Sequence, residues 1–160
     1  MRPSSRAVIS IAIATIVLSA GAYIFLSTPR QANPSSIPSH FTINGKSFSI
    51  TYVATNEGEW TAGLVNKKVT DATTMLFILP RFGIYPFWMD TVNSSLDMIW
   101  LNVTGSVGRV VYLVTDAPVC SPFIGCPTYT PSAAANYVIE AKGGFAQANG
   151  VAVGTTVQFG

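Results

Sequence analysis

Two carboxylates stand in otherwise apolar stretches of the second half of the chain. Asp97 lies between a leucine and a methionine, and Glu140 lies within residues 137–141. A carboxylate in such a place either accepts hydrogen bonds from loop amides or serves as an acid or base in hydrolysis. We expect Asp97 to accept from backbone amides of residues 91–95, and Glu140 to lie on the solvated face of its strand. The two are candidate catalytic residues only if they meet in one cleft.

A cluster of large side chains in the middle of the chain is the main candidate for ligand binding. Its centre is the run FWM, which is followed directly by an acid. Aromatic rings in a β domain either fill the core or offer a flat surface on which a sugar ring stacks, and Tyr112 shares this ambiguity. The candidate binding residues are Phe87, Trp88, Met89, Asp90, Asp97 and Trp100.

The other reactive residue types give little support for catalysis or metal binding. His40, the single histidine, is expected opposite Ser49 on the polar face of a hairpin, and therefore in solvent. Met75, Met89 and Met98 lack the clustered His or Cys partners that a soft metal needs. No nucleophile elbow, phosphate-binding loop, zinc-protease helix or C-x-x-C motif occurs. We therefore expect neither a metal nor a cofactor.

Cysteine usage points to an oxidising compartment. Cys120 and Cys126 are the only cysteines, and the segment SPFIG between them holds a proline and a glycine that can reverse the chain. We expect a disulfide, which would contribute on the order of 2 kcal/mol by closing a short ring. Half of a metal site is the alternative, but C-x5-C is not a zinc spacing. Two sequons, at Asn93 and Asn102, permit glycosylation on an exported face.

The N-terminal segment has the properties of a membrane span. Residues 7–26 form an uncharged run that is long enough to cross a bilayer as a helix. Residues 1–30 are therefore either a signal anchor, which we favour, or a signal peptide cleaved after Ala22. Arg2 and Arg6 precede the span, so the positive-inside rule places the rest of the chain outside the cytoplasm, held by the membrane or secreted.

A tether and one domain follow the span. Residues 31–39 are rich in proline and serine and hold almost no large apolar side chain, so they cannot bury themselves. Residues 40–160 have the size of a single domain. Because three of the nine basic residues lie in residues 1–30, the remainder carries six basic against seven acidic side chains. This near-neutral balance, without a basic stripe, argues against a nucleic-acid partner.

The domain is expected to open with a β-hairpin. Asn44 and Gly45 both tolerate the left-handed backbone of a type I′ turn. A two-residue loop at this position sets Phe41 opposite Phe48 and gives the hairpin one apolar and one polar face.

A short helix is expected next, over residues 57–65. Asn56 with Glu59 three residues later is typical of a capping box. Trp60 and Leu64 are one turn apart, so both should face inward.

The rest of the chain predicts strands in close succession. No helix long enough for a crossover separates them, which favours antiparallel pairing. The predicted class is mainly β (α+β): one domain of six or seven mostly antiparallel strands in a curled sheet or barrel-like sandwich, with two short helices, behind an N-terminal transmembrane helix. The further strands are expected at residues 75–79 (ended by Pro80), 96–103, 107–114, 137–141 and 155–159, with an extended segment at residues 85–89 and one helical turn at residues 145–149.

The order of these motifs resembles the domain of unknown function 192 family. The resemblance covers residues 47–158, and its most specific parts are FWM with LD seven residues later and the tail YVIE, GGFA and VG. It implies a small, mainly β domain that often follows a signal peptide or anchor, and it implies no activity. The chain has Asp90, Ser95 and Thr74 where the family commonly has a basic residue, a proline and a glycine, so the surface beside Trp88 is more acidic than in the family pattern.

Two functional hypotheses follow from the sequence. The first is a non-enzymatic extracytoplasmic module that binds a glycan, an envelope component or a protein partner through the aromatic surface near Trp88. The alternative is an envelope hydrolase that uses Asp97 with a second carboxylate. A concave pocket with two convergent acids would favour the enzyme, and separated acids beside an aromatic surface would favour binding.

Overall fold

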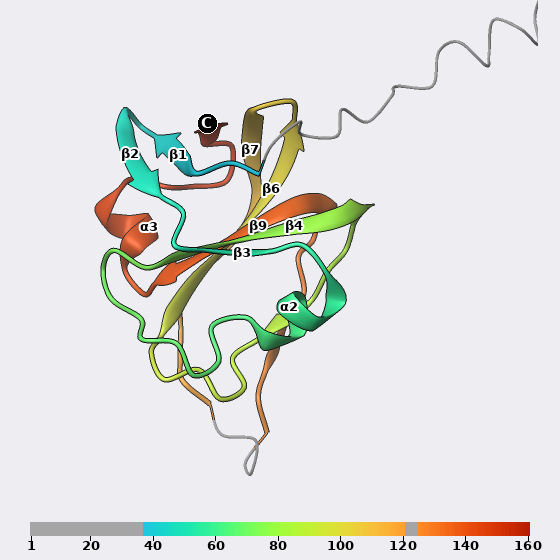
Figure 1. Cartoon of the computed structure of the whole chain (residues 1–160), viewed down its shortest axis with the longest axis vertical. Helices are drawn as coiled ribbons and strands as arrows, with labels where there is room; N and C mark the ends of the chain where they lie inside the picture. The colour runs from blue at the N-terminus through green and yellow to red at the C-terminus, as the bar shows by residue number, and fades with distance from the viewer. Residues whose placement is uncertain (1–36, 121–124) are drawn as a thin grey trace, which may run out of the picture. The chain divides into compact units, whose positions relative to one another are not determined.

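An eight-stranded curled sheet with strand order β2-β1-β10-β7-β6-β9-β4-β3 is the centre of the computed structural model, which describes residues 37–120 and 125–160 (Figure 1). A two-stranded ribbon of β5 and β8 and two short helices accompany the sheet. The mainly β class is confirmed, but these ranges hold ten strands rather than six or seven. The elements are β1 (His40–Ile43), β2 (Lys46–Ser49), β3 (Tyr52–Ala54), α2 (Glu57–Ala62), β4 (Thr74–Gly83), β5 (Phe87–Trp88), β6 (Leu96–Thr104), β7 (Val107–Ala117), β8 (Thr128–Tyr129), β9 (Ala135–Lys142), α3 (Phe145–Ala148) and β10 (Thr156–Phe159).

The predicted span and most of the predicted tether lie outside the described residues. In the ranges that are described, no helix has both the length and the apolar character needed to cross a membrane. The described residues all belong to one compact unit, Asn33–Gly160.

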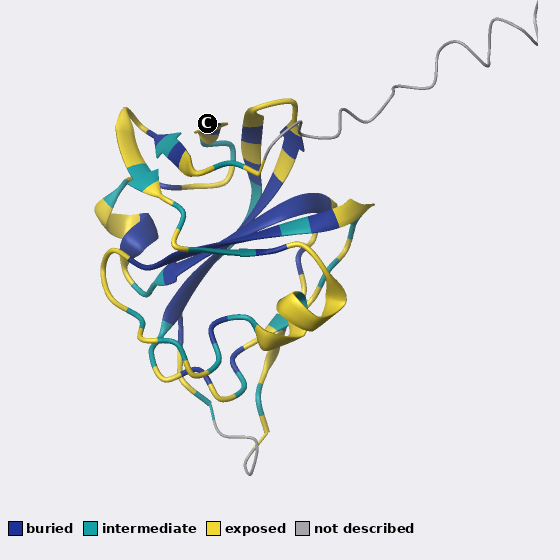
Figure 2. Ribbon diagram, viewed as in Figure 1, coloured by how far each residue is buried: buried dark blue, intermediate teal, exposed yellow. Residues whose placement is uncertain are grey.

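Three central strands, β4, β6 and β9, bury both of their faces over most of their length (Figure 2). One face, with Leu76 and Ile139, packs against the first hairpin and α3. The opposite face, with Met98 and Trp100, packs against α2 and the segment around β5. Because side chains alternate along a strand, successive residues of a central strand belong to different cores. A polar side chain in the buried middle of these strands, such as Asp97 or Glu140, is therefore enclosed by protein on whichever face it lies.

The first hairpin has the predicted register. Asn44 and Gly45 have φ angles of 49° and 78°, as a type I′ turn requires. Phe41 pairs with Phe48, and their rings stack with centroids 5.5 Å apart. The apolar face of the hairpin therefore covers one side of the sheet.

The first helix begins at the predicted cap. The Oδ1 atom of Asn56 accepts a hydrogen bond from the backbone N–H of Glu59 at 3.1 Å. The Glu59 carboxylate in turn accepts from the backbone N–H of Thr55 at 2.6 Å, one residue earlier than in the usual capping box. The helix ends before residue 65 because Gly63 takes a φ of 47°, outside the helical region.

The prediction that Pro80 ends its strand is wrong. β4 continues to Gly83, and the regular pairing with β9 is interrupted between Ile78 and Gly83. Proline lacks an N–H and is tolerated in a strand where the hydrogen-bond ladder is irregular. The interruption contains Pro80 and lets β4 run on beyond it.

Two strands were not expected from the sequence. β3 pairs parallel to β4, although only 19 residues separate Ala54 from Thr74 and they hold α2. β8 pairs with β5 and brings Tyr129 beside Phe87. Both are two or three residues long, too short to leave a periodic signal.

The first and last strands of the domain are neighbours in the sheet. β1 pairs antiparallel with β10, with Phe41 opposite Phe159. The backbone N–H of Ser39 donates to the carbonyl of Gly160 at 2.8 Å, and the N–H of Gly160 donates to the carbonyl of His40 at 3.1 Å. β10 also pairs with β7, so it joins the hairpin to the rest of the sheet.

Candidate functional site

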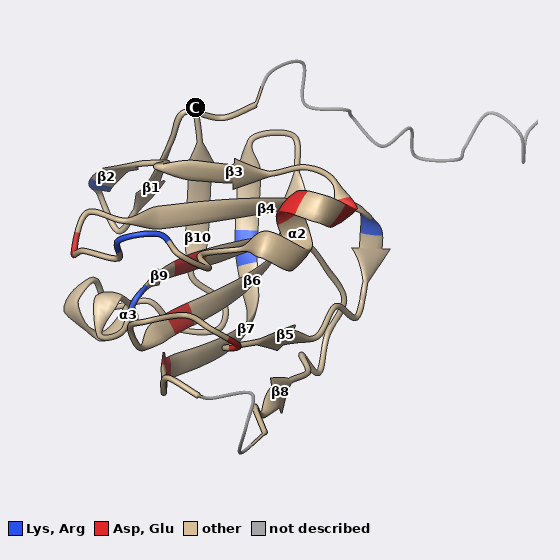
Figure 3. Cartoon of the chain, turned by 60° about the horizontal axis from the view of Figure 1, so that its bottom comes forward, with Lys and Arg blue, Asp and Glu red and all other residues tan. Residues whose placement is uncertain are grey.

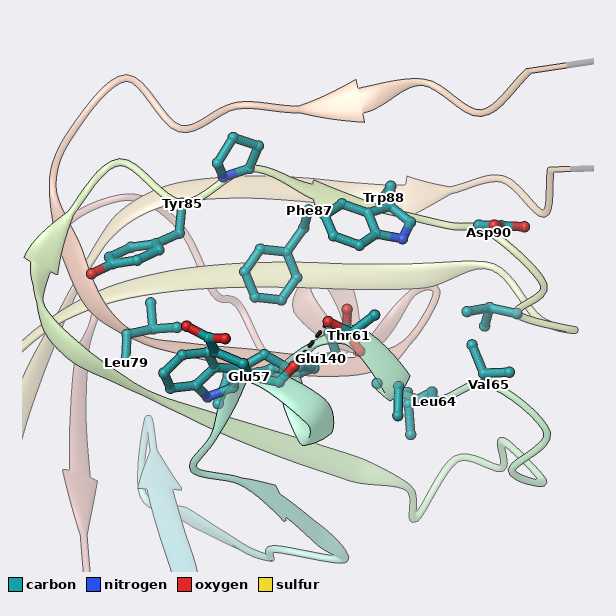
Figure 4. A pocket seen from close by; sticks show the side chains of 16 residues that line it. Glu57, Thr61, Leu64, Val65, Leu79, Tyr85, Phe87, Trp88, Asp90 and Glu140 are labelled. Carbon is teal, nitrogen blue, oxygen red and sulfur yellow. Dashed lines mark hydrogen bonds between the residues drawn. The ribbon is translucent and has the colours of Figure 1, made fainter. Parts of the chain in front are cut away.

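A pocket of about 310 Å³ lies between α2 and the segment that contains β5. Its volume is within the usual range for small-molecule sites. Tyr85, Phe87 and Trp88 form one wall, and Thr61 and Leu64 belong to the wall opposite (Figure 4). The pocket therefore contains the predicted aromatic cluster together with a helix that the sequence had not assigned to the site.

The helix wall is fixed by the cap of α2 and by Trp60. The indole N–H of Trp60 lies 3.2 Å from the carbonyls of both Ala54 and Ile78, which belong to β3 and β4. Trp60 is half-buried and Leu64 is buried, so both face inward as predicted. These contacts hold α2 over the edge of the sheet and keep the pocket open beneath it.

The aromatic wall rests on a chain of edge-to-face rings. The ring centroids of Phe77 and Phe87 are 4.9 Å apart, and those of Phe87 and Trp100 are 5.4 Å apart. Trp100 is fully buried, contacts Tyr112 in the same way, and donates its indole N–H to the carbonyl of Tyr85 at 3.0 Å. Edge-to-face packing of this kind adds about 1 kcal/mol per pair beyond burial.

The predicted binding residues therefore divide into two groups. Trp88 is 47% exposed, and together with Phe87 and Asp90 it lines the pocket. Met89 and Trp100 are both fully buried. They belong to the core on which the aromatic wall packs, and they expose no surface to a ligand.

Glu140 lies in the pocket and not in solvent, which corrects the sequence-based expectation. It is 4% exposed, and no donor among the described residues forms a hydrogen bond with its carboxyl group. Burial raises its pKa from 4.5 to about 8, because the charged form loses its hydration. The expectation failed because α2 and the β5 segment cover the face of β9 that alternation alone assigned to water.

Asp90 is the second unusual acid of the pocket. Its Oδ1 atom is buried and has no hydrogen-bond partner in the described part of the chain. Its backbone pairs with that of Cys120, and Thr91 next to it takes a φ of 56°. Asp90 is one of the residues that line the pocket.

Asp97 is structural and lies outside the pocket. Its Oδ1 atom accepts from the backbone N–H of Asp116 at 2.7 Å and of Gly144 at 3.3 Å, and its Oδ2 atom accepts from Ala146 at 2.6 Å. The role as an acceptor of loop amides is as predicted, but the donors are not residues 91–95. These two remote segments could not be inferred from neighbours in the sequence.

The two candidate catalytic acids do not meet. Asp97 pairs with Ala141 and Glu140 pairs with Met98 on the adjacent strand. Paired residues of neighbouring strands share a face, and consecutive residues alternate, so the two carboxyl groups point to opposite faces of the sheet. Only Glu140 lines the pocket.

Residues 39–159 match the family DUF192, described as an uncharacterised ACR. The chain belongs to the DUF192 family. Within the DUF192 domain the match covers the sheet, both helices and every residue that lines the pocket. No protein with a curated description matches the chain.

Two crystal structures share this fold at low sequence identity. A Sinorhizobium meliloti 1021 protein, described as a proposed transcription regulator, is 20% identical with a TM-score of 0.63, covering 75% of this chain and 90% of its own. A protein of unknown function from Novosphingobium aromaticivorans DSM 12444 is 19% identical with a TM-score of 0.63, covering 82% of this chain and 99% of its own. At these identities the similarity shows the DUF192 fold and no more.

The predicted disulfide is present in the DUF192 domain. Cys120 and Cys126 are bonded, with Cα atoms 5.4 Å apart. Cys120 follows β7 after Pro118 and Val119, and its backbone pairs with that of Asp90, so the disulfide lies next to one end of the pocket segment.

The remaining candidate positions of the DUF192 domain are on the surface. His40 is exposed and pairs with Ser49, as expected from the hairpin. Asn93 and Asn102 are both exposed. In the described ranges, no three His, Cys, Asp or Glu side chains are close enough together to hold a metal ion.

Sequence reasoning missed most of the pocket lining of the DUF192 domain, including the polar residues Glu57, Thr61 and Tyr85. Thr61 donates to the backbone carbonyl of Glu57 at 2.8 Å within α2 (Figure 4). The inward-facing Trp60 was the available signal, because a capped helix that turns an aromatic residue inward must cover some part of the sheet.

Proposed function

We propose that this chain is a membrane-anchored extracytoplasmic module that binds an envelope component, a glycan or a protein partner without transforming it. The pocket beside Trp88 is the single observation that carries the proposal. A tryptophan that remains 47% exposed at a concave site offers a flat apolar face to a ligand ring. The uncharged segment of residues 7–26 supports a membrane anchor. The basic residues that precede this segment support an orientation with the domain outside the cytoplasm.

Glu57, Asp90 and Glu140 line the pocket with Trp88, but Asp97, the acid on which the hydrolase hypothesis depends, does not. A glycosidase needs two carboxyl groups on opposite sides of one scissile bond. Asp97 is committed to three backbone N–H groups on the other face of the sheet from Glu140. The sequence-based hydrolase hypothesis therefore gains no support from the geometry of Asp97.

Saturation-transfer NMR of the purified full-length chain tests the binding function. The panel contains neutral, N-acetylated and amino sugars at equal concentration. We expect transfer to at least one of them, and we expect Trp88→Ala to abolish it, because the stacking face is lost. Phe82→Ala is the control, since Phe82 is 38% exposed and lies outside the pocket. Absence of transfer to every sugar would contradict a glycan as the ligand, and transfer that Trp88→Ala leaves unchanged would contradict the pocket as the binding site.

A further inference from the structure

We propose that the pocket recognises a primary ammonium group carried on a compact ring, with Glu140 as the principal anionic partner of that group. The inference rests on the proposed binding function and deepens it by naming the class of ligand. Its basis is the combination of a concave pocket, acidic side chains without basic ones in its lining, and buried acceptors without donors.

The charge of the pocket has one sign. Three acids line it, Glu57 from α2, Asp90 from the end of the β5 segment and Glu140 from β9, and no Lys or Arg does. Figure 3 shows acidic residues on α2 and no basic ones. The salt bridge of the described chain, Lys142 with Asp71 at 2.7 Å, lies outside the pocket lining. The pocket therefore favours a cation over an anion.

Two of these acids have acceptors without donors. Glu140 is 4% exposed and Asp90 Oδ1 is buried, and no group in the described ranges donates a hydrogen bond to either. A buried acceptor without a donor costs free energy, which a ligand that brings N–H groups removes. A primary ammonium group carries three N–H donors and no acceptor.

Other cations fit the pocket less well. The acids do not gather closely enough to ligate a metal ion within the described part of the chain. A quaternary ammonium suits an aromatic cage but has no N–H to donate, so it would leave Glu140 unsatisfied. A primary ammonium group meets both needs, since it can contact a ring face of Trp88 or Phe87 and donate to a carboxylate.

The body attached to the ammonium group is inferred from the walls. Phe87 and Trp88 offer ring faces on one side, and Leu64 and Leu79 offer aliphatic contacts. A volume of about 310 Å³ suits a single six-membered ring rather than an extended chain. A cyclic amine, such as an amino sugar, has both the flat body and the charged group.

Ammonium binding would change the protonation of Glu140. The other titratable groups that line the pocket are Glu57 on α2 and Tyr85 and Asp90 on the β5 segment. Met75 and Met98 are the partners of Glu140 on the neighbouring strands. Burial holds the pKa of Glu140 at about 8, so the group is mostly protonated at pH 7. An ammonium ion favours the carboxylate and should expel that proton, so its affinity should rise with pH toward 8.

The experiment is a calorimetric titration of the full-length chain at pH 7 with two probes of the same shape, cyclohexylamine and cyclohexanol. We expect at least tenfold tighter binding of the amine. Titration in two buffers with different ionisation enthalpies should show release approaching one proton for the amine and none for the alcohol. N,N,N-trimethylcyclohexylammonium should bind more weakly than the primary amine.

Three variants test whether the probes bind in the pocket and whether the amine contacts Glu140. Glu140→Gln keeps the shape of the side chain and should remove both the preference for the amine and the proton release. Trp88→Ala should weaken binding of both probes. Asp116→Asn removes one negative charge from an exposed position outside the pocket and should change nothing. Proton release by the unsubstituted chain is an independent measurement if Glu140→Gln does not fold.

The outcomes separate this inference from the binding function. Equal binding of amine and alcohol that Trp88→Ala abolishes overturns the ammonium inference and leaves the binding function standing. Amine binding without proton release, or unaffected by Glu140→Gln, also overturns it, as does the absence of binding by either probe. Repeating the pair with glucosamine and glucose identifies the source: a preference for glucosamine indicates an amino sugar, and a preference confined to cyclohexylamine indicates a non-sugar amine. Both of these results support the ammonium group.

Discussion

At the scale of the residue, the two buried acids of the central strands, Asp97 and Glu140, differ in how their carboxyl groups are hydrogen-bonded. The carboxyl group of Asp97 accepts hydrogen bonds from three backbone N–H groups. Glu140 has no such donors in the described chain, and its pKa is raised by burial. A charged group taken out of water needs compensating hydrogen bonds or must become neutral. One acid therefore supports the fold, and the other is available to a ligand.

Glu140 should make the protein less stable as the pH rises. The pKa of the carboxyl group is about 8 in the folded chain and ordinary when unfolded, so between pH 4.5 and 8 the folded state binds the extra proton. The contribution of Glu140 to the free energy of unfolding is therefore fully present below pH 4.5. It is lost between pH 4.5 and pH 8, by roughly 3–5 kcal/mol in total. Urea unfolding of the parent and Glu140→Gln at pH 5 and pH 8 checks this: the variant should gain on the parent at the higher pH. A difference that is the same at both pH values would count against it.

Asp97→Asn should lower the free energy of unfolding by roughly 1–3 kcal/mol. An amide can offer only one oxygen, so one of its ends would place an NH₂ group against backbone N–H donors at 2.6–3.3 Å. Thermal and urea denaturation measure the loss, with Asp116→Asn as the matched control on the exposed surface. A melting temperature equal to or above that of the parent would show that the three hydrogen bonds of Asp97 do not stabilise the fold.

At the scale of the element, the sequence predicted the features whose interacting residues are close together in the chain. It did not predict which distant elements pack against each other. The turn at Asn44 and Gly45 and the cap at Asn56 were predictable because their partners are within four residues. The alternation of β9 was also legible, but water was assigned to the face of Glu140 because no sequence signal shows that α2 covers it. The pocket is formed by elements separated by up to 83 positions, from Glu57 to Glu140, and only packing brings them together.

The cap of α2 should matter for the pocket as well as for stability. Asn56→Ala removes the acceptor for the N–H of Glu59 and should cost about 1 kcal/mol of unfolding free energy. Because α2 forms one wall, ligand affinity should fall together with stability. Asn93→Ala is the control, an exposed asparagine outside any cap. Urea unfolding and the amine titration are the measurements, and an unchanged midpoint would show that the tertiary contacts of Trp60 hold the helix alone.

At the scale of the whole molecule, the pocket needs access to the compartment that holds its ligand. The positive-inside rule predicts that residues 31–160 lie outside the cytoplasm. Protease added to intact cells should remove the domain and leave a membrane-bound stub, detected with an N-terminal tag. A domain that resists protease until the cells are lysed would reverse the orientation and move the proposed ligand to the cytoplasm.

The pairing of β1 with β10 has a consequence for the order in which the chain is made. Strand β10 spans Thr156–Phe159 and hydrogen-bonds to both β1 of the hairpin and β7, which no other strand in residues 37–120 and 125–160 does. During synthesis the hairpin emerges first and must wait more than 100 residues for this partner, so the sheet cannot be completed while the ribosome still holds β10. A nascent chain therefore leaves its central strands without the cover of the hairpin until β10 has left the ribosome, and that interval is when a chaperone has most to protect.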